Sequence, residues 1–136
     1  MSSVYWTGKN EIYKGFVVSL EVFQEIEHFS PIEFAHPEKL NPDLLILLDA
    51  ARKVAGIPFY IKSDYREGDP RAHGDGDGLD FGLQKESHVI SGRERYLVLP
   101  SLLSSGFHRI GIYDRHFHVD VSNRLPGKVI WMGDSQ

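Results

Sequence analysis

Residues 41–63 read NPDLLILLDAARKVAGIPFYIKS, a stretch that places a helix directly before a strand. It opens with Asn41, a helix-capping residue type, followed by a proline that suits the first helical position. Gly56 can end the helix, so we predict a helix over residues 42–55. The next residues, 57–63, are rich in β-branched and aromatic types and predict a strand.

On both sides of this unit the pattern predicts short elements. Upstream, Ser19 can cap a short helix whose apolar stripe reaches Ile26. Downstream, residues 67–78 (EGDPRAHGDGDG) contain several glycines and a proline, which predict a loop. Residues 79–83 are then expected to begin the next strand.

A further helix is predicted to begin at residue 92. Ser91 and Glu94 have the spacing of a capping box, in which each side chain bonds the backbone of the other residue. Pro100 is expected to end or kink this helix and to leave residues 101–105 as a separate turn.

The last third of the chain predicts three short strands, FHRIGIY, HFHVDVS and KVIWMG, with turns at residues 114–115 and 125–127. No repeat, charge block or linker divides the 136 residues, of which 41% are hydrophobic, so we treat residues 1–136 as one domain. The fold class expected is α+β, with two or three helices packed on a mostly antiparallel sheet.

Composition and charge exclude several classes of function. Lys and Arg number 15 against 19 Asp and Glu, a net charge of −4 that argues against nucleic acid as a partner. The absence of Cys removes thiolate metal sites and thiol nucleophiles, so a metal site must use His and carboxylate ligands. The apolar runs are too short to span a bilayer. Residues 1–18 lack the pattern of a signal peptide, so we expect synthesis in the cytoplasm without one. Separately, we expect the protein to be a monomer.

The segment HFHVD at residues 116–120 concentrates polar groups on one side of a predicted strand. Alternate side chains share a face, so His116, His118 and Asp120 point the same way while the residues between them face the core. This face is either a functional site or simply the solvated side of the sheet. Asp120 in turn either orients an imidazole or is a solvated acid.

A second polar cluster comes from the glycine-rich segment. His73 and Asp80 lie seven positions apart, and the glycines between them would let both reach one ion. Alternatively the acids of this segment are ordinary turn residues, and their spacing does not fit a calcium-binding EF-hand loop. Together, His73, Asp80 and His118 offer two imidazoles and a carboxylate, which suits zinc with one open position. A non-haem iron triad using His118 and Asp120 lacks a later histidine.

The chain carries three motifs in order: SDYR at residues 63–66, HGDGDGLD at 73–80 and HFH at 116–118. They resemble the motifs of the zinc D-alanyl-D-alanine carboxypeptidase family, whose fold is shared by hedgehog signalling domains. The family patterns are S-G-Y-R, S-x-H-x-x-G-x-A-x-D and a late H-x-H or a carboxylate ahead of the final His. The resemblance extends over residues 41–131 and implies a hedgehog/DD-peptidase-like fold.

The resemblance implies a role for each matching residue. His73, Asp80 and His118 would bind Zn²⁺, Arg66 would engage the carboxylate or carbonyl of the substrate, and His116 would assist catalysis as general base.

The chain departs from the family at several positions. Asp64 replaces Gly, Gly78 replaces Ala, and Arg71 stands where Ser precedes the first ligand. Arg115 occupies the position of the usual carboxylate base, which leaves His116 or Asp114 for that role.

The function implied is a zinc metallopeptidase that hydrolyses peptidoglycan stem peptides or cross-links next to D-amino acids, as a carboxypeptidase or endopeptidase. A phage-type lytic enzyme of this kind, resembling an endolysin, would act at the cell wall. The alternative is a non-catalytic zinc-containing binding module of the same fold. The remaining histidines, namely His28, His36, His88 and His108, are interpreted as surface or loop residues. Trp6, Trp131 and the tyrosines are interpreted as core or rim residues, of which some could line a substrate groove.

Overall fold

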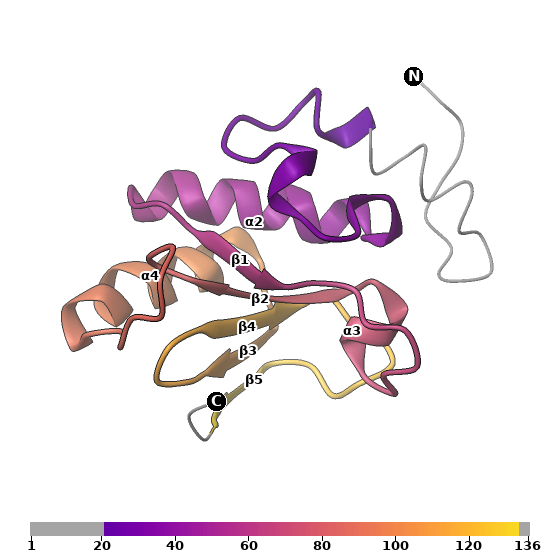
Figure 1. Ribbon diagram of the computed structural model, residues 1–136. Coiled ribbons are helices and arrows are strands. Elements are labelled where there is room, and N and C mark those ends of the chain that lie inside the picture. The colour runs from indigo at the N-terminus through magenta and orange to yellow at the C-terminus, as the bar shows by residue number, and fades with distance from the viewer. Residues whose placement is uncertain (1–20, 134–136) are drawn as a thin grey trace.

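A five-stranded sheet in the order β1-β2-β4-β3-β5 is the framework of the computed structural model, which describes residues 21–133 (Figure 1). Neighbouring strands are antiparallel except β3 and β5, which run parallel. The strands are β1 (Tyr60–Ser63), β2 (Gly78–Gly82), β3 (Arg109–Ile112), β4 (Phe117–Asp120) and β5 (Val129–Met132).

Two long helices cover one face of this sheet, and a short helix lies in the connection between β1 and β2 (Figure 1). The long helices, α2 and α4, also pack against each other. The helices are α2 (Pro42–Ala55), α3 (Ala72–Asp75) and α4 (Gly92–Ser105), preceded by 3₁₀ turns at Pro31–Glu33 and Pro37–Lys39. The α+β class predicted from the sequence is therefore confirmed. Among residues 21–133, none of the helices combines the length and apolar character that crossing a membrane requires.

The bounds of α2 agree with its sequence signals. The Asn41 side chain accepts a hydrogen bond of 3.0 Å from the backbone N–H of Asp43, which satisfies an otherwise unpaired donor. Gly56 ends the helix in the left-handed conformation, at φ +73°. Capping residues in the sequence thus fix both ends of the predicted helix.

Two predictions about the helices are wrong. The expected loop over residues 67–78 contains the helical turn α3, which Gly76 ends with a left-handed φ of +76°. Helix α4 does not end at Pro100 but continues to Ser105. Proline removes the backbone donor that would bond the Tyr96 carbonyl, and Tyr96, at 80% exposed, lies on the solvent side of the helix.

The strands follow the predictions with small shifts. The strand expected over residues 57–63 begins only at Tyr60, and the turn predicted at residues 114–115 is closed by a hydrogen bond of 3.0 Å from Tyr113 N–H to the His116 carbonyl. The short helix expected after Ser19 has its cap outside the described residues.

The two faces of the sheet differ in chemistry because side chains alternate along each strand. Apolar residues of β2, β3 and β4 enter the core beneath α2 and α4, where Phe81 stacks between two other rings. The core residues of these three strands are Leu79, Phe81, Ile110, Ile112, Phe117 and Val119. The intervening positions point to the opposite face, here called the open face.

The capping box of α4 allows the contribution of the Glu94 carboxylate to the free energy of unfolding to be measured. The backbone N–H of Ser91 donates to the Glu94 carboxylate at 2.8 Å, and His88 also bonds it; these bonds hold the pKa of Glu94 below its ordinary value. The ionised carboxylate therefore contributes stability above about pH 4.5, and this contribution is lost as the pH falls through the lowered pKa. We expect Glu94→Gln to reduce the free energy of unfolding by about 0.3–1 kcal/mol at pH 7.

Urea unfolding at pH 7 and pH 3 measures this effect. The deficit of Glu94→Gln should shrink at pH 3, whereas Glu86→Gln, which changes an exposed loop residue, should match the parent protein at both pH values. A deficit of the same size at pH 3 would show that the charge of Glu94 is not its source.

Candidate metal centre

One row of residues crosses the open face of the sheet from edge to edge. Strand register places Asp80 of β2 opposite His118 of β4, and His118 opposite Gly111 of β3. The row ends at Ser63 of β1 on one side and at Trp131 of β5 on the other. Residues 38 positions apart in the sequence, Asp80 and His118, are therefore direct neighbours.

Helix α3 brings His73 to this row. The turn packs closely on the preceding loop: a Cβ at Gly74 would lie 1.8 Å from the backbone oxygen of Asp69, so this position accepts only glycine. The His73 carbonyl accepts a hydrogen bond of 3.0 Å from the backbone N–H of Arg66. These contacts hold the buried His73 imidazole against the sheet.

Three side chains converge at this point. The Asp80 Oδ1 atom lies 3.3 Å from His73 Nε2 and 2.9 Å from His118 Nδ1, and one ligand atom of each residue lies within 4.8 Å of the others. Tetrahedral zinc with bonds of about 2.0–2.1 Å keeps its ligand atoms about 3.3 Å apart. The three residues predicted from the sequence are thus brought together at a spacing that could hold a metal ion.

The other nitrogen of each imidazole has its own partner. His73 Nδ1 lies 2.6 Å from the backbone oxygen of Asp64, and His118 Nε2 lies 2.6 Å from Asp120 Oδ2. When these nitrogens carry the protons, His73 Nε2 and His118 Nδ1 are left to face Asp80. Such outer hydrogen bonds fix the tautomer and orientation of metal-binding histidines, so the donor set fits a zinc ion.

Asp120 is a buried part of this arrangement rather than a solvated acid. It is 1% exposed, and its Oδ1 atom accepts hydrogen bonds from Arg109 Nε at 2.8 Å and from the backbone N–H of Ser122 at 3.1 Å. Its carboxylate bonds the far nitrogen of His118, so it is not positioned beside the facing ligand atoms. This placement disfavours an iron triad built from His118 and Asp120.

Two further acids of the glycine-rich segment, Asp75 and Asp77, have structural contacts. Asp75 accepts a hydrogen bond of 2.7 Å from Arg124, and Asp77 accepts one of 3.0 Å from the Asn41 amide. Burial raises the pKa of Asp77, and the Asn41 bond opposes this effect. These two residues tie α3 to the rest of the chain, as expected for turn acids.

Burial, hydrogen bonds and neighbouring charges shift the pKa values of Asp80 and His118. Burial raises the pKa of Asp80, but hydrogen bonds and the charges of His118 and His73 outweigh it, and the net pKa lies well below the usual range. For His118 burial has the opposite effect and lowers the pKa, but the hydrogen bonds to Asp120 and Asp80 outweigh it, and the net pKa is raised. A metal ion binds only the deprotonated nitrogen of an imidazole, so a raised pKa of His118 would make metal binding weaker at low pH.

His116 lies at the edge of the triad, just before β4. Its Nε2 atom is 4.0 Å from Asp80 Oδ2, and its ring stacks on Tyr113 with the centroids 4.4 Å apart. Burial lowers the pKa of His116, and the charge of Asp80 only partly opposes this. A neutral imidazole at this position can accept a proton near neutral pH.

The alternative base, Asp114, lies at the exposed hairpin turn. Among the described residues, no hydrogen bond or ion pair joins its carboxylate to His73, Asp80 or His118. The neighbouring Arg115 donates a hydrogen bond of 3.0 Å to Ser87. The geometry therefore favours His116 over Asp114 as the group beside the site.

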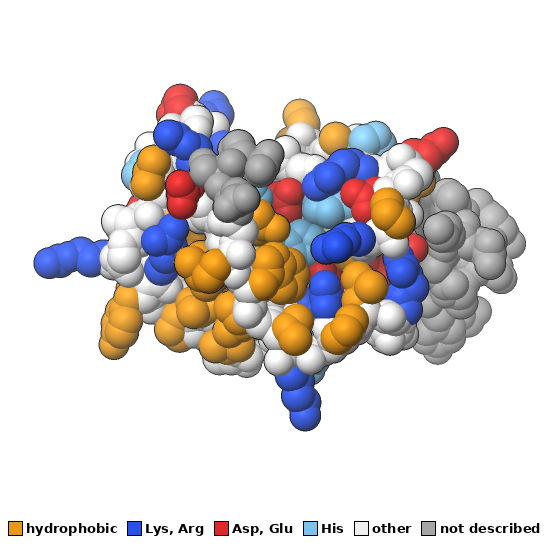
Figure 2. Space-filling view, turned by 90° about the horizontal axis from the view of Figure 1, so that it is seen from below, with side chains coloured by type: hydrophobic (Ala, Val, Ile, Leu, Met, Phe, Trp, Pro, Cys, Tyr) orange, Lys and Arg blue, Asp and Glu red, His pale blue; other side chains and the backbone are white. Residues whose placement is uncertain are grey.

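Arg66 lies on the β1 side of the triad. It contacts Asp80 Oδ2 and Asp69 Oδ2 at 3.4 Å each, and its Nε donates to Ser63 Oγ at 3.2 Å. Its side chain is about half exposed, at 51%, so the guanidinium can meet a ligand from solvent. Figure 2, seen from below, shows histidines between hydrophobic side chains and Lys or Arg side chains on this part of the surface.

Sequence reasoning missed the place of His36 and left Trp131 either in the core or rim or in a substrate groove. His36, interpreted as unrelated to the site, lies 3.2 Å from Asp64, whose backbone oxygen bonds His73. Trp131 lies with its ring centroid 5.5 Å from that of His118. No local spacing signals either contact, because both depend on chain segments that meet only in the folded sheet.

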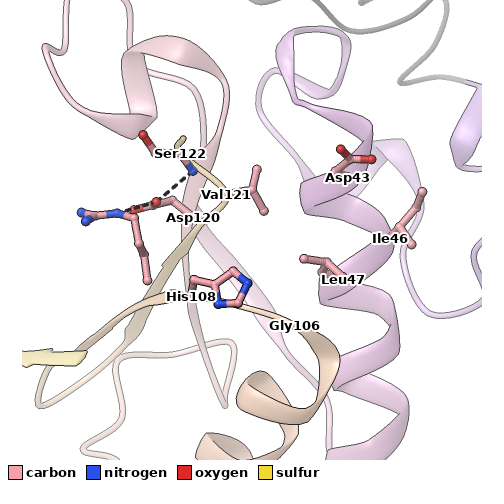
Figure 3. A pocket seen from close by; sticks show the side chains of 9 residues that line it. Asp43, Ile46, Leu47, Gly106, His108, Asp120, Val121 and Ser122 are labelled. Atoms are coloured by element: carbon pink, nitrogen blue, oxygen red, sulfur yellow. Dashed lines mark hydrogen bonds and ion pairs between the residues drawn. The ribbon is translucent and has the colours of Figure 1, made fainter. Parts of the chain in front are cut away.

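A separate pocket of about 360 Å³ lies on another side of Asp120, as the close view shows (Figure 3). Ile46 and Leu47 of α2 line it on one side, and His108 and Val121 line it on the other. Asp120 borders both this pocket and the triad.

In comparisons with known proteins, the chain matches no family model, no curated protein and no solved structure. What the site can do chemically is therefore inferred from its residues and their geometry.

Proposed function

We propose that the protein is a zinc-dependent peptidase that hydrolyses peptidoglycan stem peptides or cross-links next to D-amino acids. The observation that carries this proposal is the convergence of His73, Asp80 and His118, with the outer nitrogen of each imidazole already bonded. Three protein ligands of this type, with an open fourth position, are typical of catalytic zinc.

His73, Asp80 and His118 would hold the zinc ion, which would lower the pKa of a water molecule and polarise the carbonyl of the scissile bond. The chain provides the remaining functions. His116, beside Asp80, would accept a proton from the attacking water and pass it to the amine that leaves when the peptide C–N bond breaks. Asp120 and the Asp64 carbonyl keep the two imidazoles oriented throughout.

Arg66 is proposed to bind the terminal carboxylate of the substrate through its planar guanidinium. We expect Arg66→Ala to raise KM for peptides with a free C-terminus by about tenfold or more, since hydrogen bonds to charged groups contribute about 1.5–3 kcal/mol. Steady-state kinetics should show a much smaller change for the same peptide with an amidated C-terminus. Arg93→Ala, which removes an exposed arginine of α4, is the matched control and should leave both KM values unchanged.

A second candidate function is favoured by one observation. Arg115 lies three residues before His118, at the position where many peptidases of the family that the chain resembles carry a carboxylate base. The Arg115 side chain donates a hydrogen bond to Ser87. A zinc-containing module that binds peptides without cleaving them would need no base. This alternative predicts bound zinc and peptide affinity with no turnover.

Mass spectrometry of purified peptidoglycan fragments tests the proposed function directly. The fragments are incubated with zinc-loaded protein, with chelator-treated protein and with chelator-treated protein to which zinc has been returned. Loss of a terminal alanine or cleavage of a cross-link only in the two zinc-containing samples supports the peptidase and identifies the bond. Unchanged fragments with one tightly held zinc per chain would instead support the binding module.

A further inference from the structure

Trp131 lies across the centre of the open face because the strand beneath it carries a glycine. In the sheet register, Trp131 of β5 is opposite Gly111 of β3, and Gly111 is opposite His118 of β4. A Cβ at position 111 would lie 2.7 Å from atoms of the indole ring, closer than carbon atoms pack. The missing side chain of Gly111 therefore lets the indole reach His118, with 5.5 Å between the ring centroids.

Two contacts hold the indole in this position. Its Nε1–H donates a hydrogen bond of 3.1 Å to the Tyr113 hydroxyl, and the Arg109 guanidinium lies 5.1 Å from the ring centroid. Tyr113 in turn stacks on His116. Trp131, Tyr113 and His116 thus form one continuous surface beside the three candidate ligands, here called the aromatic wall.

The aromatic wall and Arg66 flank the triad from opposite directions. Arg66 contacts Asp80 from the β1 side, whereas Trp131 contacts His118 from the β5 side, and β1 and β5 are the two edges of the sheet. Trp131 is only partly buried, so a ligand can reach it. A peptide that crosses the triad would meet a cation at one end and an apolar surface at the other.

We propose that the aromatic wall is the subsite for an apolar side chain on the substrate residue that supplies the scissile carbonyl. This inference rests on the proposed function, in which Arg66 holds the carboxylate of the leaving residue on the other side of the bond. The peptide then runs from β5 to β1 in its N-to-C direction. An aliphatic side chain gains by leaving water against the indole, whereas glycine gains nothing there.

Paired substrates test the subsite. N-acetyl-L-Lys-D-Ala-D-Ala and N-acetyl-L-Lys-Gly-D-Ala differ by one methyl group at the residue assigned to the wall. Trp131→Ala is expected to reduce kcat/KM for the D-Ala peptide by roughly tenfold, the low end for one methylene in an apolar pocket, and to change the Gly peptide far less. Trp131→Phe keeps an aromatic ring and should preserve most of the preference.

Gly111→Ala provides a second, independent perturbation, because its methyl group displaces the indole while Trp131 stays in the chain. We expect it to reproduce the loss of preference seen in Trp131→Ala. Tyr113→Phe removes only the hydrogen bond to the indole and separates the loss of that bond from the loss of the apolar surface. Zinc stoichiometry, measured for each variant, should remain that of the parent protein.

Fluorescence separates failure of this inference from failure of the proposed function. The chain has two tryptophans, so a Trp6→Phe background leaves Trp131 as its only indole. If peptides shift its emission with a preference for D-Ala but are not cleaved, the aromatic wall binds the apolar side chain of the peptide, and the peptidase assignment fails. If peptides are cleaved and Trp131→Ala keeps the full preference for D-Ala, the subsite is wrong and the peptidase stands. If the peptides are neither bound nor cleaved, both the subsite and the peptidase assignment are overturned.

Discussion

Replacing His118 with Ala is expected to abolish stoichiometric zinc binding and peptide hydrolysis together. His118 offers Nδ1 at 2.9 Å from Asp80, and a catalytic zinc site of three protein ligands cannot lose one without losing most of its affinity. Zinc is measured by competition with a chromophoric chelator and by metal analysis after dialysis. Hydrolysis is measured by mass spectrometry on the same preparation.

Two controls make this experiment interpretable. His108→Ala removes an exposed histidine of the pocket in Figure 3 and should leave both zinc and hydrolysis unchanged. His118→Asn retains a polar side chain between Asp80 and Asp120, and its circular dichroism reports whether the fold survives. Full activity in a folded His118 variant would falsify the assignment of this residue as a ligand.

His116→Ala is expected to lower kcat by roughly 10²-fold or more while one zinc per chain stays bound. The reason is that His116 lies 4.0 Å from Asp80 but does not belong to the converging triad. Single-turnover cleavage measures the rate, and metal analysis of the same sample measures the zinc. In a pure binding module the substitution would change peptide affinity with no rate to lose.

Neighbouring substitutions serve as controls for His116. Arg115→Ala removes a side chain that bonds Ser87, and it should leave the rate unchanged. Asp114→Asn should also leave it unchanged, because the Asp114 carboxylate lies at the exposed hairpin turn. A 10²-fold loss in Asp114→Asn with full activity in His116→Ala would move the role of base to Asp114.

Local sequence signals were sufficient where the physical cause is local. The bounds of α2 follow from Asn41 and Gly56, which satisfy the end groups of the helix whatever surrounds it. The alternation in HFHVD likewise placed His118 and Asp120 on one face, because strand geometry alone requires it. The same local reasoning failed at Pro100, since the cost of a missing backbone bond depends on whether water reaches the carbonyl.

The sequence by itself determined which groups are available: two capped helices, a sheet with one polar face, and histidines and carboxylates as its metal-binding side chains. Only the tertiary structure decided which of them meet. Strand order places Asp80 beside His118, and a helical turn in a glycine-rich segment adds His73. Arg109 changes Asp120 from a surface acid into a buried partner, because a carboxylate loses water at low cost only where other donors replace it.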